Sequence, residues 1–453
     1  MDNIVLLGKN HHTREACPAA GQGFFHHKGT KFTKKNKKLC VLCAFVVQLG
    51  CGQSRATNER RQFQIHQYFF FLLLSFCFFL SGCSRLAVKQ VTQRDLDVSC
   101  LAGLSPERRS FAATDLSLPL EEIARFKVSA AVSQHLCATR DAIFVPTLDG
   151  RLVIVDLRPP KNPKKHKKKI LQKTKLAGGH SGTIALAQQS LVVAMRFGKE
   201  TLIRYDLQNG RKLWEIDAGD IESEPLLTDS LIFVTALYKH VDAYRLQDGR
   251  RRWQFRAESQ FHASPALSQG ILVAASDDGR VYGLEAVSGK KLWEYDCHEP
   301  VLATPAIHQN RVYLGTAGES VLALNLPDGA LLWKNKTGAK VTHAPAVNDS
   351  LVILSCGDGR VRAFEVNQGA ARWTFRAGSV IGTSPLIAGH FVFFGSLDHN
   401  FYALNARTGD LRWQQELEGR VRTNPIIVGE RLIVASEDRF VYVFGKAAPA
   451  GTN

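Results

Sequence analysis

The residues best suited to chemistry in this chain recur at one fixed spacing. The six tryptophans are separated by 39 or 40 residues and are Trp214, Trp253, Trp293, Trp333, Trp373 and Trp413. Their indole rings could stack on a quinone or a sugar. A ring that is present in every repeat cannot mark one unique site, so we interpret the tryptophans as packing groups that join neighbouring repeats.

A second set of polar side chains lies just before six prolines that recur every 40 residues. These prolines are Pro225, Pro265, Pro305, Pro345, Pro385 and Pro425. The candidate binding residues beside them are Glu222, Glu224, His262, His343 and Arg422, with Thr383 and Asn424 at related positions. Carboxylates, imidazoles and a guanidinium at one end of a repeat could bind a small polar ligand or a partner protein. The alternative is that they are solvated residues without a ligand.

No motif in the chain predicts catalysis, a cofactor or a metal. It contains no adjacent cysteine pair, calcium-binding loop or nucleophile elbow. The histidines and cysteines within residues 1–58 match no zinc-binding spacing. Downstream, Cys137 and Cys356 lie in apolar runs and are expected to be buried thiols. The pairing of Cys100, Cys137, Cys297 and Cys356 is left open, because sequence alone does not define disulfide connectivity.

The repeat itself predicts the elements that carry these residues. Residues 261–297 contain four short runs rich in alternating apolar and β-branched residues, separated by turns such as Asp278-Gly279 and Ser288-Gly289. Alternation with period two excludes helical solenoids. Four strands in about 40 residues are typical of one blade of a β-propeller.

The number of repeats predicts an all-β, eight-bladed propeller of four-stranded antiparallel blades. Six full units span 179–418, and a degenerate unit at 131–178 precedes them with Leu171 expected at the tryptophan position. The last unit, 419–446, has only three strand runs. We expect an N-terminal strand from 118–130 to complete it and close the ring, because closure removes unpaired sheet edges.

The net positive charge of the chain comes from two segments. The formal net charge is +17, of which residues 1–66 carry +8 and the tract from Arg158 to Lys175 carries +9. A nucleic-acid groove needs basic residues distributed along a face, so nucleic-acid binding is not expected. The tract could contact anionic lipid head groups, or it could be a solvated loop.

A targeting segment precedes the repeats. Tyr68 to Leu80 is an apolar run too short to span a bilayer and suited to a signal peptide. It ends in Leu80-Ser81-Gly82-Cys83, which resembles the bacterial lipobox. The resemblance implies cleavage before Cys83, lipidation of its thiol and, with Ser84 following, delivery to the outer membrane. We expect the true start of translation to lie downstream of residues 1–58.

The repeat motif carries a family resemblance. The segment from Ala403 to Trp413 (ALNARTGDLRW) resembles the tryptophan-docking motif of PQQ-type propeller repeats, and Ala323 to Trp333 and Gly283 to Trp293 are close variants. A lipobox followed by one eight-bladed propeller is similar to the BamB family of outer-membrane assembly lipoproteins. The resemblance to PQQ-type repeats covers about residues 131–446.

The resemblance implies a non-catalytic scaffold in outer-membrane β-barrel assembly. It implies a monomer within a hetero-complex that presents its interblade loops to a BamA-like partner, faces the periplasm and is anchored to the outer membrane. The alternative is a periplasmic propeller that binds PQQ or a saccharide and has a redox or sensing role. The expected organisation is a leader (1–82), a lipidated N-terminus and linker (83–117), the propeller (118–446) and a C-terminal tail (447–453).

Overall fold

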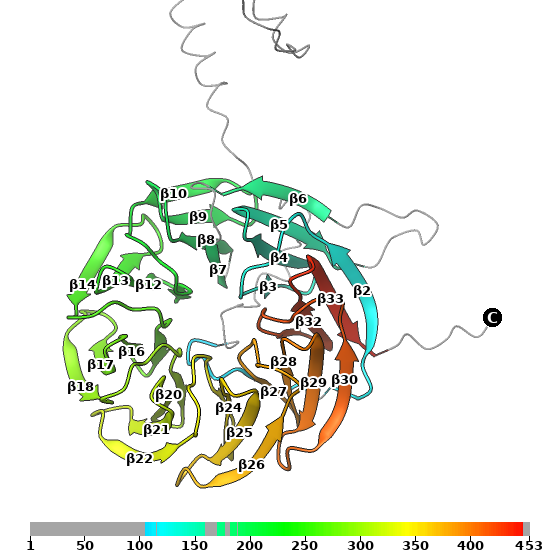
Figure 1. Ribbon diagram of the computed structural model, residues 1–453. Helices are drawn as coiled ribbons and strands as arrows, with labels where there is room; N and C mark the ends of the chain where they lie inside the picture. Colours follow the sequence, from blue (N-terminus) through cyan, green and yellow to red (C-terminus); the bar gives the residue numbers. More distant parts are fainter. Residues whose placement is uncertain (1–104, 115, 159–169, 177–181, 188, 447–453) are drawn as a thin grey trace, which may run out of the picture. The chain divides into compact units, whose positions relative to one another are not determined.

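The structure is a computed structural model that describes residues 105–446 apart from 115, 159–169, 177–181 and 188. Every element within these residues is a strand, and the strands form eight sheets arranged as blades around an axis (Figure 1). The predicted all-β, eight-bladed propeller is therefore confirmed. The leader, the lipobox, Cys100, the C-terminal tail and much of the basic tract lie outside the described residues.

The first four blades follow one another in the chain, with four strands each. Blade 1 holds β3 (Cys137–Ala138), β4 (Ala142–Thr147), β5 (Arg151–Asp156) and β6 (Ile170–Lys175); blade 2 holds β7 (Gly182–Ala187), β8 (Ser190–Met195), β9 (Leu202–Asp206) and β10 (Lys212–Ile216). Blade 3 holds β11 (Leu226–Leu227), β12 (Leu231–Ala236), β13 (His240–Arg245) and β14 (Arg251–Arg256); blade 4 holds β15 (Ala266–Ser268), β16 (Ile271–Ala275), β17 (Arg280–Glu285) and β18 (Lys291–Asp296).

The remaining blades follow the same plan, with two additions from the N-terminal part of the chain. Blade 5 holds β19 (Ala306–His308), β20 (Arg311–Gly315), β21 (Ser320–Asn325) and β22 (Leu331–Lys336); blade 6 holds β23 (Ala346–Val347), β24 (Leu351–Ser355), β25 (Arg360–Glu365) and β26 (Ala371–Arg376). Blade 7 holds β27 (Leu386–Ala388), β28 (Phe391–Gly395), β29 (Asn400–Asn405) and β30 (Leu411–Glu416), with β1 (Phe111–Ala112) added to its inner edge; blade 8 holds β31 (Ile426–Val428), β32 (Arg431–Ala435), β33 (Phe440–Gly445) and β2 (Glu121–Lys127).

Blade 8 combines strands from both ends of the described chain. Its inner three strands are C-terminal, whereas β2 pairs antiparallel with β33 in the outer position, from Glu121 opposite Gly445 to Lys127 opposite Phe440. β2 lies within the segment 118–130 that the sequence analysis expected there. Phe126 and Val128 join the apolar cluster shared by blades 8 and 1.

The hydrophobic core is divided among the blade interfaces. Eight clusters of buried apolar side chains are present, and each draws its members from two neighbouring blades. The middle strands are buried almost throughout, while the outer strands alternate, as in β22, where buried Trp333 lies between exposed Leu332 and Lys334. Since each buried aliphatic side chain contributes roughly 1.5–3 kcal/mol, blade-to-blade packing is the main source of stability.

The tryptophans join each blade to the next by a repeated hydrogen bond. The indole N–H groups of Trp214, Trp253, Trp293, Trp333 and Trp373 each donate to the backbone carbonyl 32 or 33 residues later, in the next blade, over 2.7–3.0 Å. Trp413 instead makes edge-on contacts with Phe444 and Phe401, at centroid distances of 5.5 and 6.3 Å. These are structural contacts, which fits the interpretation that the rings do not mark one ligand site.

The glycine of each turn explains why the motif requires that residue type. Gly329 has a φ of +72°, and a Cβ added to it would lie 2.5 Å from the ring of Trp293 in the preceding blade. Both the left-handed conformation and the close ring exclude side chains at this position. On the neighbouring strand, the residue paired with each tryptophan of blades 3 to 7 is also small (alanine or glycine), and a Cβ on Gly283 would lie 2.1 Å from Trp293. In blade 2, Trp214 is paired with Arg204 instead.

The register of blade 1 corrects one expectation. Leu171 was expected at the tryptophan position, but Gln172 lies opposite Ile154, and Leu171 falls in the bulge beside it. The prediction is wrong by one residue because the inserted basic tract hides the alignment. Leu171 still packs against the apolar cluster shared by blades 1 and 2, so an aliphatic side chain contributes to this interface where other blades use an indole.

Candidate functional site

An N-terminal strap, residues 105–112, crosses the inner strands near the axis. The backbone N–H groups of four successive blades donate to its carbonyl oxygens over 2.8–2.9 Å. These bonds are Leu267 to Pro106, Ile307 to Glu107, Val347 to Arg109 and Ile387 to Ser110. The four donors are 40 residues apart, so one non-repeating segment satisfies the same edge group of four repeats. The strap lies in the segment 83–117, which was expected to be a linker because it contains no repeat signal.

Arg108 points from the strap into the ring and is only 1% exposed. Its Nη1 lies 2.7 Å from Glu224 Oε2, and its other nitrogens donate to the carbonyls of Glu224, Pro225 and Pro265. His135 Nδ1 contacts the second carboxylate oxygen of Glu224. The strap is therefore tied to blades 1, 3 and 4 by one buried charged cluster.

The electrostatics of the cluster favour its charged form. Burial raises the pKa of Glu224, but His135 and Arg108 outweigh burial, so the pKa of Glu224 is lowered overall. Burial lowers the pKa of Arg108, and Glu224 opposes that shift. A buried pair of this kind stabilises little by itself, but removal of one partner leaves an uncompensated charge.

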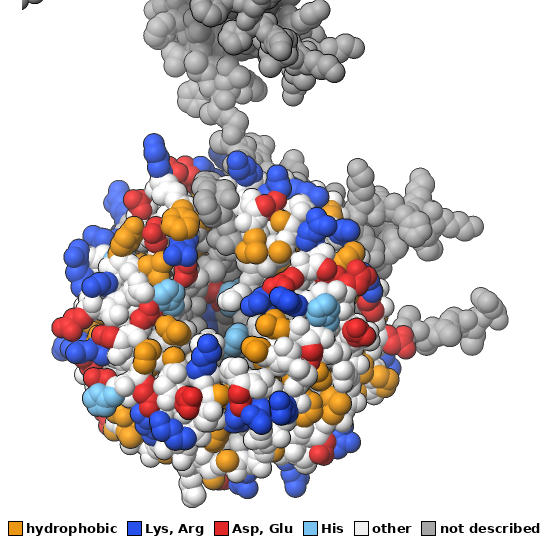
Figure 2. Space-filling view, viewed as in Figure 1, with side chains coloured by type: hydrophobic (Ala, Val, Ile, Leu, Met, Phe, Trp, Pro, Cys, Tyr) orange, Lys and Arg blue, Asp and Glu red, His pale blue; other side chains and the backbone are white. Residues whose placement is uncertain are grey.

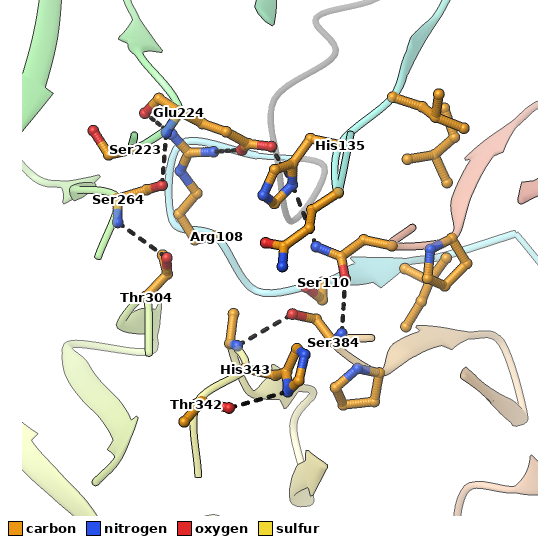
Figure 3. Close-up of a pocket in the computed structure, with 18 of the residues that line it drawn as sticks. Arg108, Ser110, His135, Ser223, Glu224, Ser264, Thr304, Thr342, His343 and Ser384 are labelled. Carbon is orange, nitrogen blue, oxygen red and sulfur yellow. Dashed lines mark hydrogen bonds and ion pairs between the residues drawn. The ribbon is translucent and has the colours of Figure 1, made fainter. Parts of the chain in front are cut away.

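Above the strap lies a central cavity of about 250 Å³ (Figure 3). The floor includes Arg108 and Ser110, and the wall is formed by the segments that lead into the inner strands. The other lining residues are Gln134, His135, Leu136, Glu222, Ser223, Glu224, His262, Ser264, Leu302, Thr304, Thr342, His343, Ala344, Ser384, Pro385, Leu386, Asn424, Pro425 and Ile426. The ring is hollowed at its centre on the face that Figure 2 shows.

Four of the five predicted binding residues line this cavity. Glu224 belongs to the buried cluster, while Glu222 contacts Arg196 and lies 3.4 Å from His262 Nε2. The other ring nitrogen of His262 lies 2.6 Å from Asp277. His343 lies nearby on the wall, and burial lowers the pKa of its imidazole to about 4. His343 is therefore uncharged near neutral pH.

The other predicted residues have different surroundings. Arg422 is half exposed, lies outside the cavity lining and forms an ion pair with Glu437 at 2.5 Å. Thr383 is fully buried and accepts a hydrogen bond from the N–H of Gly395. Arg108 and His135 also line the cavity but were not predicted from the sequence. Arg108 lies in the non-repeating strap, and His135 lies in blade 1, which lacks the repeat proline that aligns the other blades.

Several lining residues also connect the blades. The side chains at the position before the repeat proline accept backbone N–H bonds from the preceding blade: Ser264 from Glu224, Thr304 from Ser264, Ser384 from Ala344 and Asn424 from Ser384. These bonds, of 2.7–3.1 Å, explain the small polar residues at this position. The wall of the cavity is therefore fixed by the closure of the ring.

The lining does not suit PQQ, the cofactor of the alternative hypothesis. PQQ is a tricarboxylate, and its burial requires cationic partners. The fully buried cation of the lining, Arg108, is already paired with Glu224, and a volume of about 250 Å³ is below the ~300–1,000 Å³ of pockets for drug-sized ligands. Among the described residues, no group of three His, Cys, Asp or Glu side chains is arranged to hold a metal ion.

An arc of exposed apolar side chains lies on the loops between the second and third strands of blades 1, 2 and 3. This apolar arc consists of Leu148, Phe197 and Tyr238, which are 54%, 43% and 63% exposed. The equivalent loops of blades 4 to 8 carry no exposed large hydrophobic residue within the described chain. Arg196 stacks on the ring of Phe197 and pairs with Glu222, so the arc adjoins the cavity lining.

Two further features complete the described chain. Cys137, Cys297 and Cys356 are buried, and burial raises the pKa of Cys297 to about 12 and that of Cys356 to about 11. No helix long and apolar enough to cross a bilayer occurs among the residues that the structure describes.

Comparisons with solved structures place the ring in a widely used fold. BamB from Moraxella catarrhalis is 17% identical, with a TM-score of 0.59 over 72% of this chain and all of that one. A europium-containing methanol dehydrogenase is 10% identical, with a TM-score of 0.65 over 78% of this chain and 99% of that one. The computationally designed protein Ika8 is 16% identical, with a TM-score of 0.63 over 72% of this chain and 99% of that one. At such identities the likeness concerns the fold alone, which is shared by enzymes and non-enzymes.

The sequence comparison is more specific. No curated protein matches the chain. The family model described as "Outer membrane protein assembly factor BamB" matches residues 164–262, 238–374 and 357–448, which together exceed half of the chain. The propeller with its PQQ-like repeats agrees with this match. The chain therefore belongs to the BamB family of outer membrane protein assembly factors.

Proposed function

We propose that this protein is a non-catalytic scaffold in the assembly of outer-membrane β-barrel proteins, and that it acts by presenting its loops to a BamA-like partner. The observation that carries the proposal is the family match over residues 164–448. The rigid ring supports it, since every blade interface is packed and the repeat tryptophans join successive blades. A rigid scaffold lets loops act as a pre-organised binding surface.

The apolar arc is the surface that we assign to this partner. Exposed aromatic residues are enriched at protein interfaces, and Tyr238 and Phe197 are the exposed aromatic side chains of these loops. The neighbouring Arg196 and Glu222 supply a charged rim. The arc is confined to three adjacent blades, which suits one partner bound off-centre on the ring.

The proposal includes a membrane anchor at Cys83. A diacylglyceryl thioether on Cys83 would hold the ring at the periplasmic face of the outer membrane, as the lipobox Leu80-Ser81-Gly82-Cys83 suggests. Two acyl chains give stable anchoring, whereas one chain gives only marginal binding. The intact mass of the mature chain tests this step: a mass lacking acyl chains on Cys83 would contradict it.

Co-purification tests the role itself. The tagged full chain is extracted in mild detergent, and proteins retained at near-native stoichiometry are identified. We expect a BamA-like barrel protein to be retained by the wild type and lost when Phe197 and Tyr238 are both changed to Asp. Leu331→Asp, on an exposed outer strand, serves as the matched control. If no barrel assembly protein is retained by the wild type, the proposal fails.

A further inference from the structure

The central cavity adjoins the apolar arc at Glu222, but its interior is not used in the proposed scaffold role. Its volume of about 250 Å³ is slightly smaller than that of pockets for drug-sized ligands. Its floor is the strap, which four blades fix through the backbone bonds described above. The cavity is therefore a built feature of the closed ring, and the nature of its lining decides what could enter it.

The charged groups of the lining are already satisfied by one another. Arg108 and His135 share the carboxylate of Glu224, and Glu222 contacts both Arg196 and His262. An ion that entered would lose its hydration without meeting an unpaired opposite charge, which is unfavourable. The lining therefore disfavours ionic ligands of either sign.

The uncharged part of the lining has the opposite character. Hydroxyl and amide groups of Ser110, Gln134, Thr342 and Ser384 lie in the lining. Figure 3 shows His343 beside Thr342 on the wall, and the lowered pKa of His343 keeps its ring neutral and able both to donate and to accept. Apolar surface comes from Leu136, Leu302, Pro385, Leu386, Pro425 and Ile426.

We propose that the central cavity binds a small uncharged polyhydroxylated molecule of the size of a monosaccharide. The hydroxyl groups of such a ligand would bond to the neutral polar side chains, and its C–H faces would pack on the proline and leucine wall. Because Arg108 and Ser110 form the floor, binding also stabilises the strap in its docked position. Occupancy of the cavity and docking of the strap are therefore thermodynamically linked.

Titration calorimetry on the full chain tests this inference, with D-glucose, D-galactose and N-acetyl-D-glucosamine as uncharged probes and PQQ as the anionic probe. We expect saturable one-to-one binding of at least one sugar and none of PQQ. In Leu302→Trp, which fills the cavity, sugar affinity should fall by about tenfold or more, whereas Leu331→Trp on the outer strand should leave it unchanged. Leu302 lies in the cavity lining, whereas Leu331 is exposed on β22.

Hydrogen exchange provides a readout of the strap that a surface site would not change. Sugar binding should slow exchange at the amides of Leu267, Ile307, Val347 and Ile387, which donate to the strap. Binding that survives unchanged in Leu302→Trp overturns the inference, as does binding of PQQ alone. Failure of all the probes to bind overturns it as well, and none of these outcomes bears on capture of the barrel partner.

Discussion

The ring wall, which consists of the packed interfaces between blades, and the region around the axis are stabilised by different kinds of contact. In the wall, the same tryptophan, glycine and small residue recur in successive blades and make the same hydrogen bond. At the axis, equivalent positions carry different residues, such as Glu222, His262 and Thr342, and a non-repeating strap crosses them. Repeated contacts build the scaffold, whereas the contacts made only once create individual sites.

The largest expected effect lies in the wall. Trp333→Ala should lower the free energy of unfolding by roughly 3–5 kcal/mol, because it opens a cavity between blades 5 and 6 and removes the indole donor. Urea denaturation followed by fluorescence or circular dichroism measures the change. Leu331→Ala, exposed on the same strand, should change stability by less than about 0.5 kcal/mol. Equal effects would contradict the packing role of the indole.

The charged cluster at the axis should come next. Arg108→Ala leaves Glu224 buried with only His135, so the loss should lie toward the lower end of the ~3–5 kcal/mol typical of broken buried pairs. The exposed pair of Arg372 and Glu365 provides the control, since Arg372→Ala should cost no more than about 1 kcal/mol. Denaturation of both variants measures the difference.

A double variant separates charge pairing from other effects at the axis. Removing Glu224 as well as Arg108 should cost less than the sum of the two single changes, because neither member of this pair is left buried without the other. Additive losses would show that the two side chains do not depend on each other, contrary to the 2.7 Å contact.

A smaller effect is expected at the turn glycine that touches the wall. Gly329→Ala should destabilise the protein by roughly 1–3 kcal/mol, because a non-glycine residue is strained at a φ of +72° and its Cβ would press on Trp293. Gly270 also has a positive φ, but a Cβ there meets no atom within 4 Å. Gly270→Ala should therefore cost less, and a greater loss at Gly270 than at Gly329 would contradict the docking account.

The smallest effect depends on pH. Burial raises the pKa of Glu299, but hydrogen bonds from Thr316, Ser320, Lys334 and Lys336 outweigh burial and lower the pKa from 4.5 to about 2. Because the folded-state value is the lower one, this stabilisation is present above about pH 4.5 and is lost as the pH falls toward 2. Glu299→Gln should flatten the stability profile across that interval, and an unchanged slope would contradict the assignment.

The sequence predicted the wall far better than the axis. Tryptophan, glycine and proline at one period defined the blades, because each residue type makes the same contact in every repeat. Blade 1 was placed one residue out of register at Leu171, since an insertion breaks the period there. Arg108 and His135 could not be identified, because a contact made only once leaves no periodic signal. The four candidate residues that line the cavity could be singled out because they keep the repeat register.

The central claim is that the loops of blades 1 to 3 contact a barrel-assembly partner. Site-specific photo-cross-linking in cells tests it most directly, with the reactive residue placed at Tyr238 or at Leu411, which are both exposed but lie on different parts of the ring. We predict an adduct with a BamA-like barrel protein from position 238 and none from position 411. Equal adducts from both positions, or no such adduct at 238, would contradict the account.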